Sequence, residues 1–164
     1  MKTKGSVMIT ASHNPREFNG LKLGTGYSET MVTAEIQALR ELVEAGEVSE
    51  GQGKITARDI YPSYKETILK NFNLQKHWKI VVDACNNGSG YFYPDLLRDA
   101  GCAVIEQNTE LDGNFPLGAP DPTESEVLDR LAEGVKNAGA DLGFAYDTDD
   151  DRMAVVDENG QVLW

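Results

Sequence analysis

In the C-terminal part of the chain, short apolar segments alternate with stretches of helical periodicity, and this alternation constrains the fold more than any other feature of the sequence. Apolar runs of strand length cover 80–84, 102–106 and 141–146, and helical spacing of apolar residues precedes each of them. Such chains form parallel sheets with helices packed on them. The runs 153–156 and 161–164 predict a closing hairpin. We therefore expect an α/β fold in which helices flank a mostly parallel sheet.

Local signals delimit the expected helices. Ser63 with Glu66, and Thr123 with Glu126, have the spacing of a capping box at a helix start. Gly139 follows the last helical stretch and suits a helix end, because glycine readily adopts the left-handed backbone found there. These signals place helix starts near Ser63 and Thr123.

The beginning of the chain has a different pattern. Segments 6–11, 21–23 and 54–60 have strand character, and 33–45 has the apolar spacing of a helix. Turn residues separate these segments. We expect three strands and one helix in this part of the chain.

The expected elements divide the chain into two domains. Residues 1–58 supply few elements, close to the size below which a domain rarely folds alone. They begin almost at once with a strand, so we interpret 1–58 as the C-terminal part of a larger domain whose first part is absent. Residues 59–164 contain enough helices and strands to close a core of their own, and we expect them to form a second domain.

The turn after the apolar run 141–146 is strongly acidic, with Asp147, Asp149 and Asp151 at alternate positions and Arg152 beside them. Ligands of α/β proteins collect at the carboxyl ends of strands. Alternate carboxylates of an extended loop can supply oxygens to one hard cation. Without a cation they would repel one another and take up protons. The pattern therefore predicts a metal site.

Three other interpretations of the acidic turn stay open. It can be a solvated surface turn. It can be an EF-hand loop, although Arg152 occupies the position that requires glycine and the flanking segments have strand character. It can also carry an aspartyl-phosphate nucleophile, with Asp147 or Asp149 attacking phosphorus.

A second turn of interest, TASHNP, occupies 10–15. Asn-Pro is a turn signal, and Pro15 excludes Asn14 from the helical region. This places Ser12 at a loop tip. The alternative is a turn serine that satisfies nearby backbone groups.

Together the two turns resemble the α-D-phosphohexomutase family. TASHNP with the downstream NGLK at 19–22 is similar to that family's phosphoserine loop, and DTDDDR at 147–152 is similar to its metal loop, usually D-G-D-x-D-R. Three further segments look like the bacterial phosphomannomutase/phosphoglucomutase branch: 81–84, 112–116 and 120–122. The resemblance covers nearly the whole chain. It implies a fragment of a longer, multidomain enzyme, with 1–58 ending its first domain and 59–164 forming its second.

The resemblance implies a phosphoryl transfer on a hexose phosphate by way of a hexose bisphosphate. Ser12 would carry the phosphoryl group. Mg²⁺ would be held by Asp147, Asp149 and Asp151 with an oxygen on Ser12, and it would neutralise developing charge. As an isolated fragment, the chain is expected to be inactive.

Three more residues receive roles from the same resemblance. Arg152 would steady the phosphoserine, Lys22 would transfer a proton at the sugar hydroxyl, and His13 would orient nearby groups. Taken without the resemblance, Lys22 is an exposed strand lysine and His13 packs in a turn.

Two departures from the family pattern affect these expectations. Thr148 stands where the family usually has glycine. If the position needs a positive φ, threonine there costs about 1–3 kcal/mol. Gly118-Ala119 replaces a stretch that often contains histidine, which leaves the sugar undefined.

The net charge is −12, from 27 acidic and 15 basic side chains. Such a balance argues against nucleic acid and anionic membranes as partners.

No run is long and apolar enough to span a bilayer, and no signal-peptide core follows Met1, so we expect a cytoplasmic location. An alternative function is a non-catalytic module that binds a partner or forms a homo-oligomer through apolar surface of the incomplete domain 1–58.

Overall fold

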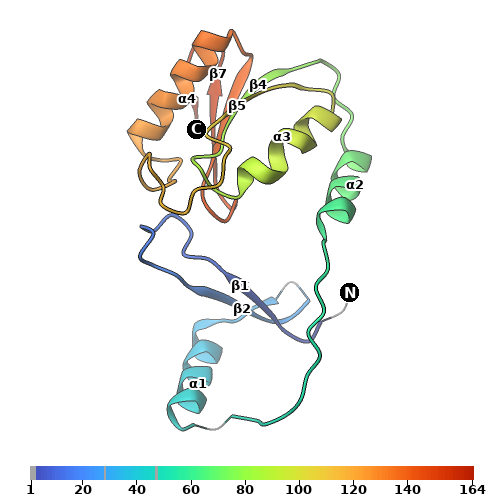
Figure 1. Cartoon of the computed structure of the whole chain (residues 1–164), viewed down its shortest axis with the longest axis vertical. Helices are drawn as coiled ribbons and strands as arrows, with labels where there is room; N and C mark the ends of the chain where they lie inside the picture. Colours follow the sequence, from blue (N-terminus) through green and yellow to red (C-terminus); the bar gives the residue numbers. More distant parts are fainter. Residues whose placement is uncertain (1–2, 28, 47) are drawn as a thin grey trace. The chain divides into compact units, whose positions relative to one another are not determined.

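The computed structural model describes residues 3–27, 29–46 and 48–164 (Figure 1). The chain forms two compact units. The first unit comprises Met1–Thr10 and Gly20–Asp59, and the second comprises Ala11–Asn19 and Ile60–Trp164. Ala11–Asn19 thus packs with the second unit, although its neighbours in sequence on both sides belong to the first.

The first unit contains an antiparallel sheet and one helix. Its strands lie in the order β1 (Ser6–Ile9), β2 (Leu21–Gly26) and β3 (Glu29–Thr30), followed by α1 (Thr33–Glu44). None of its described residues is buried. Because hydrophobic stabilisation grows with the apolar area that is removed from water, packing within this unit contributes little of it.

The strand predicted at 54–60 is wrong, because this segment has no regular structure. Ile55 is 99% exposed there. A strand is stable only when a neighbour pairs its backbone groups, and the sheets of the described chain do not include this segment. The third strand of the first unit is instead the short β3.

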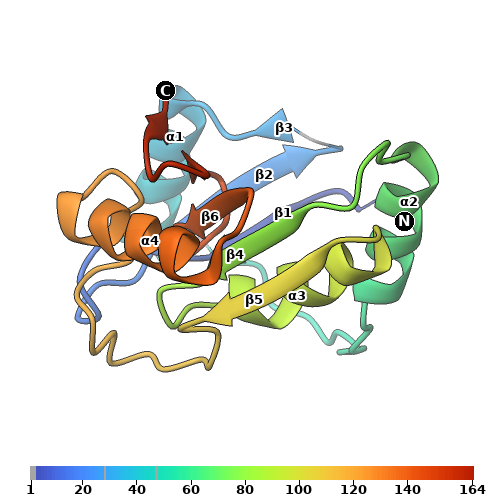
Figure 2. The ribbon, with the colours of Figure 1, turned by 90° about the horizontal axis from the view of Figure 1, so that it is seen from above.

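The second unit is built on a mixed sheet of five strands. Their order is β5 (Ala103–Gln107), β4 (Lys79–Asp83), β6 (Leu142–Tyr146), β7 (Met153–Asp157) and β8 (Val162–Leu163). β5, β4 and β6 run parallel, and β4 and β5 are seen side by side in Figure 2. β7 and β8 add the predicted antiparallel hairpin. The expected α/β fold is confirmed.

Helices pack on both faces of this sheet. They are α3 (Ser89–Asp99) and α4 (Ser125–Ala138), while α2 (Tyr61–Asn71) packs against α3. Leu131 and Val135 of α4 pack with Val81 on one face, and Leu97 of α3 packs with Val82 on the other. Each fully buried Leu or Val contributes about 1.5–3 kcal/mol of hydrophobic free energy. This packing holds the strand ends that carry the site.

Both predicted capping boxes of the second unit are wrong. α2 begins at Tyr61, with Pro62 in its first turn, so Ser63 lies inside the helix. Before α4, the backbone N and the hydroxyl of Thr123 both donate to Asp121, at 2.9 and 2.7 Å. That local turn removes Thr123 from the cap position. The helix end at Gly139 is confirmed by its left-handed backbone, with φ of 55°.

Among the described residues, no helix has both the length and the apolar character needed to cross a membrane.

Candidate active site

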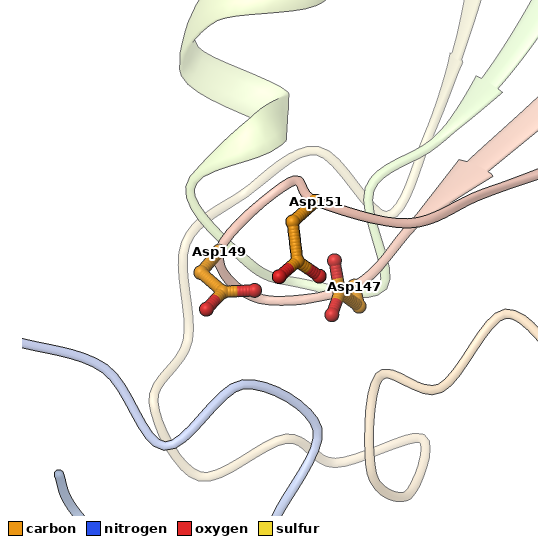
Figure 3. Close-up of side chains that lie close together, drawn as sticks. All are labelled: Asp147, Asp149 and Asp151. Atoms are coloured by element: carbon orange, nitrogen blue, oxygen red, sulfur yellow. The ribbon is translucent and has the colours of Figure 1, made fainter. Parts of the chain in front are cut away.

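The acidic turn connects β6 to β7 at the carboxyl end of β6. Backbone hydrogen bonds close it: Asp147 N donates to Arg152 O and Asp150 N donates to Asp147 O, both at 3.3 Å. Asp147, Asp149 and Asp151 each offer one carboxylate oxygen, and the three oxygens lie within 4.8 Å of one another (Figure 3). The alternate spacing in sequence therefore produces a cluster of three carboxylates in space.

The three carboxylates fit a hard divalent cation. Oxygens on opposite sides of Mg²⁺ lie about 4.2 Å apart, twice the usual Mg–O distance. Small side-chain rotations can therefore bring the three oxygens, which lie within 4.8 Å of one another, around one cation. Asp147 is buried, whereas Asp149 is half-buried and Asp151 is exposed. The cluster is thus open on one side, where further ligands can approach.

Asp147 is the buried centre of the site, and its charge is balanced by Arg152. Its Oδ1 accepts a hydrogen bond from Arg152 N at 3.1 Å. Its Oδ2 accepts from Arg152 Nε at 3.0 Å and from Nη2 at 2.6 Å. A fully buried carboxylate is tolerated only when it is paired and hydrogen-bonded in this way.

Ser12 lies directly against this ion pair, although 135 residues separate it from Asp147 in sequence. Its hydroxyl donates to Asp147 Oδ2 at 3.1 Å, and Arg152 Nη2 donates to its Oγ at 2.9 Å. The backbone of Ser12 is left-handed, with φ of 56°. Asn14 N donates to Ala11 O at 3.1 Å and closes the predicted turn. The turn directs the hydroxyl toward the carboxylate cluster.

His13 and Asp121 form the next layer around Ser12. His13 Nδ1 is 3.4 Å from Ser12 Oγ and also contacts Arg152 Nη2. Asp121 Oδ2 lies 3.8 Å from His13 Nε2 and 3.7 Å from Arg152 Nη1. Partial burial acts to raise the pKa of Asp121, but hydrogen bonds from Thr123 and the charges of Arg152 and His13 outweigh it and lower that pKa. Asp121 therefore remains a carboxylate.

Asp121 was missed as a site residue in the sequence. Its position in the Pro-Asp-Pro segment at 120–122 fits the family resemblance but carries no local signal of a chemical role. Its contact with His13 joins residues far apart in the chain, so local spacing does not reveal it.

Lys22 lies in β2, in the first unit, where its side chain is exposed and it pairs in register with Met8. Its role in proton transfer stays a prediction. The other predicted site residues, from Ser12 and His13 to the acidic turn and Arg152, all lie in the second unit.

The strain considered for Thr148 does not arise, because Thr148 has no positive φ. The left-handed residue of the turn is Asp150, with φ of 59°. Burial, followed by the charges of Asp147 and Asp149, raises the pKa of Asp150 to about 7. The EF-hand interpretation is wrong, because the strands β6 and β7 flank the turn and an EF-hand requires helices.

Two family models match the chain. The model described as phosphoglucomutase/phosphomannomutase, alpha/beta/alpha domain II, matches residues 62–160. The model described as alpha/beta/alpha domain I of the same proteins matches residues 1–50. Together these matches cover most of the sequence.

Individual proteins agree with the family models. The chain is 40% identical over 164 residues to the phosphomannomutase/phosphoglucomutase of Pseudomonas aeruginosa, covering 100% of the chain and 35% of the relative. It is 38% identical over 160 residues to the phosphoglucomutase of Neisseria gonorrhoeae, covering 96% of the chain and 35% of the relative. The crystal structure of a phosphoglucomutase/phosphomannomutase family protein from Burkholderia thailandensis superposes with a TM-score of 0.90 at 32% identity, over 98% of the chain and 35% of that structure. The chain thus spans about a third of these relatives' length.

Proposed function

The chain belongs to the phosphoglucomutase/phosphomannomutase family, and from this membership we propose that it forms part of an enzyme that moves a phosphoryl group between two oxygens of a hexose phosphate. One observation carries the proposal. The hydroxyl of Ser12 touches both a carboxylate of the acidic cluster and the guanidinium of Arg152. A phosphoryl acceptor and the groups that neutralise its charge are thereby side by side.

In the proposed reaction, Ser12 Oγ carries the phosphoryl group. The group passes to the hexose phosphate, which becomes a hexose bisphosphate, and the other phosphoryl group of the sugar returns to Ser12. Arg152, whose Nη2 is 2.9 Å from Oγ, donates hydrogen bonds to the phosphoryl oxygens. His13 limits the orientations available to the serine and the guanidinium. Positioning and charge neutralisation account for most catalysis of phosphoryl transfer.

We assign Mg²⁺ to the acidic cluster, with Asp147, Asp149 and Asp151 as its protein ligands. When bound, the cation supplies positive charge next to the transferring phosphoryl group. Asp147 links the two halves of the site, because it belongs to the cluster and also accepts the hydroxyl of Ser12.

The remaining parts of the proposal concern the longer protein. We infer that 1–58 is the end of a first domain and that 59–164 is a second domain. Lys22 would transfer the proton at the sugar hydroxyl. Because the chain spans 35% of the relatives' length, we expect no turnover by the chain alone. We place the enzyme in the cytoplasm.

Intact-mass spectrometry tests the proposed acceptor. The chain is incubated with glucose 1,6-bisphosphate and Mg²⁺, and we expect a gain of one phosphoryl mass, located on Ser12 by fragmentation. Ser12→Ala should stay unlabelled, whereas Ser63→Ala, which removes a serine exposed on α2, should label like the wild type. Labelling at another residue, or equal labelling of Ser12→Ala, would contradict the proposal.

A second candidate function is self-association through the first unit. None of the described residues of that unit is buried, and its apolar side chains Val7 and Ile9 are 61% and 71% exposed. Contiguous exposed apolar surface favours association with other chains.

A further inference from the structure

Asn87 occupies the turn between β4 and α3, and only 1% of it is exposed. The turn starts where β4 ends at Asp83, and Asn87 N donates to Ala84 O at 2.9 Å within it. The side chain points away from solvent toward the carboxyl end of β6. A buried amide at a strand end needs partners for all of its polar atoms.

The amide of Asn87 uses its full hydrogen-bonding capacity. Its Nδ2 donates to Tyr146 O and to Asp147 O, both at 3.1 Å. Its Oδ1 accepts from Ser89 N at 2.8 Å and also from the hydroxyl of Ser89. Because the partners of Nδ2 are carbonyls and one partner of Oδ1 is a backbone N–H, the orientation of the amide is determined.

These contacts replace a missing strand neighbour. The parallel pairing of β4 with β6 ends at Asp83 and Ala145. The carbonyls of Tyr146 and Asp147 follow this last pair, so β4 does not supply their hydrogen-bond donors. Nδ2 of Asn87 pairs the carbonyls of Tyr146 and Asp147 at this point. Asp147 O also accepts Asp150 N, the bond that closes the acidic turn. One side chain thus holds the peptide group from which the acidic turn begins.

We propose that Asn87 is a positioning residue, which sets the place of Asp147 within the carboxylate cluster and thereby the cluster's affinity for a divalent cation. The inference rests on the proposed metal role of the cluster. The hydrogen bonds of the Asn87 side chain go to Ser89 and to the carbonyls of Tyr146 and Asp147, so Asn87 acts on the cluster through the backbone of Asp147. Groups that orient metal ligands typically contribute about 10–100-fold to metal affinity.

Binding of Mn²⁺ to the full chain, measured by electron paramagnetic resonance, tests this role. We expect Asn87→Asp to weaken Mn²⁺ binding by about tenfold or more. The substitution keeps the shape of the side chain but replaces the two N–H donors with an oxygen that faces two carbonyl oxygens. Ser89→Ala is the matched control, because it removes a buried hydrogen bond on the other side of the same amide and leaves both donors to the acidic turn in place.

Thermal unfolding of both variants separates positioning from stability. We expect both to unfold at lower temperature than the wild type, with weakened Mn²⁺ binding in Asn87→Asp alone. Equal Mn²⁺ affinity of Asn87→Asp and wild type, or equal losses in both variants, would overturn the inference. Absence of Mn²⁺ binding by the wild type would instead overturn the metal role in the proposed function, and this inference with it.

Titration of the wild type with Mg²⁺, followed by nuclear magnetic resonance, tests the same role if Asn87→Asp does not fold. The side-chain amide resonances of Asn87 should shift together with the backbone amides of Asp149 and Asp151, and with the same affinity. Resonances of Asn87 that stay in place while those of the turn move would overturn the inference.

Discussion

At the scale of single residues, Ser12 combines an unfavourable backbone with favourable side-chain contacts. Its φ of 56° lies in the left-handed region, which costs a residue with a Cβ atom about 1–2 kcal/mol. The hydroxyl bonds to both Asp147 and Arg152. The backbone therefore presents the hydroxyl to the site before any substrate binds.

Comparison of Ser12→Gly with Ser12→Ala measures the free-energy cost of the left-handed backbone at this position. Both variants lose the hydroxyl and its hydrogen bonds, but only glycine adopts a positive φ without strain. We expect Ser12→Gly to be more stable than Ser12→Ala by about 1 kcal/mol, measured by urea denaturation. Equal stability of the two variants would show that this left-handed conformation is not under strain.

Asp150 makes stability depend on pH. Burial first, and then the charges of Asp147 and Asp149, raise its pKa to about 7. The folded chain thus keeps a proton that the unfolded chain loses near its ordinary pKa of about 4. The free energy of unfolding is therefore highest below pH 4 as far as this group is concerned, and it falls as the pH rises from about 4 to 7.

We expect Asp150→Asn to remove this dependence. In buffer with a metal chelator, the variant should exceed the wild type in stability by on the order of 2–4 kcal/mol at pH 8 and by little at pH 4. Asp157→Asn is the control, because it should change the pH dependence of stability in the opposite direction. Hydrogen bonds, chiefly from the backbone of Gln161, lower the pKa of Asp157, so this carboxylate stabilises the fold at high pH and not at low pH. If the free energies of unfolding of Asp150→Asn and wild type differ by the same amount from pH 4 to 8, the expectation is contradicted.

At the scale of elements, the close packing of α4 on β6 positions the start of the acidic turn. A Cβ atom at Gly143 of β6 would lie 2.5 Å from Val135 Cγ2 and 2.9 Å from Leu131 Cδ1, both on α4. Real Cβ atoms do not approach other atoms so closely. The absence of a side chain at Gly143 therefore lets α4 approach β6, the strand that leads into Asp147.

We expect Gly143→Ala to destabilise the second unit by about 1–3 kcal/mol, because the helix or the strand must shift to admit the methyl group. Gly113→Ala is the matched control, since a Cβ atom there would meet no other atom within 4 Å. Urea denaturation of both variants measures the difference. Comparable stabilities of the two variants would show that α4 and β6 can move apart to admit the methyl group without a loss of stability.

At the scale of the whole molecule, the two units differ in how much they bury. The second unit has clusters of fully buried side chains on both faces of its sheet, around Val81 and Val82. The described residues of the first unit include no buried side chain. The second unit therefore contains what is needed for independent stability, whereas the first has apolar surface left to cover.

We expect the chain to form dimers at high concentration through the first unit, measured by light scattering after size-exclusion chromatography. Ile9→Lys should shift the population toward monomer, because a charge replaces an apolar side chain that is 71% exposed. Gln37→Lys adds the same charge at an exposed position on α1 and should leave the population unchanged. A wild type that is monomeric at every concentration would rule out this association.

Local sequence patterns predicted most elements of the second unit. Strand length and helical spacing indicated β4 to β8 and the helices between them, because periodicity reports which face of an element is buried. Helix starts were less predictable: Thr123 binds Asp121 instead of capping α4, since a nearby carboxylate competes for the same donors. The segment 54–60 has strand composition but no partner strand.

The sequence by itself determined the acidic cluster, because alternate residues after a buried strand end up on one side of a turn. It also determined the turn that exposes Ser12, since Asn-Pro restricts the backbone locally. Only the tertiary structure decided that 11–19 packs with the second unit, and that Asp121 and Asn87 surround the site. These contacts join residues far apart in the chain, and such contacts depend on how the elements pack, which no local pattern encodes.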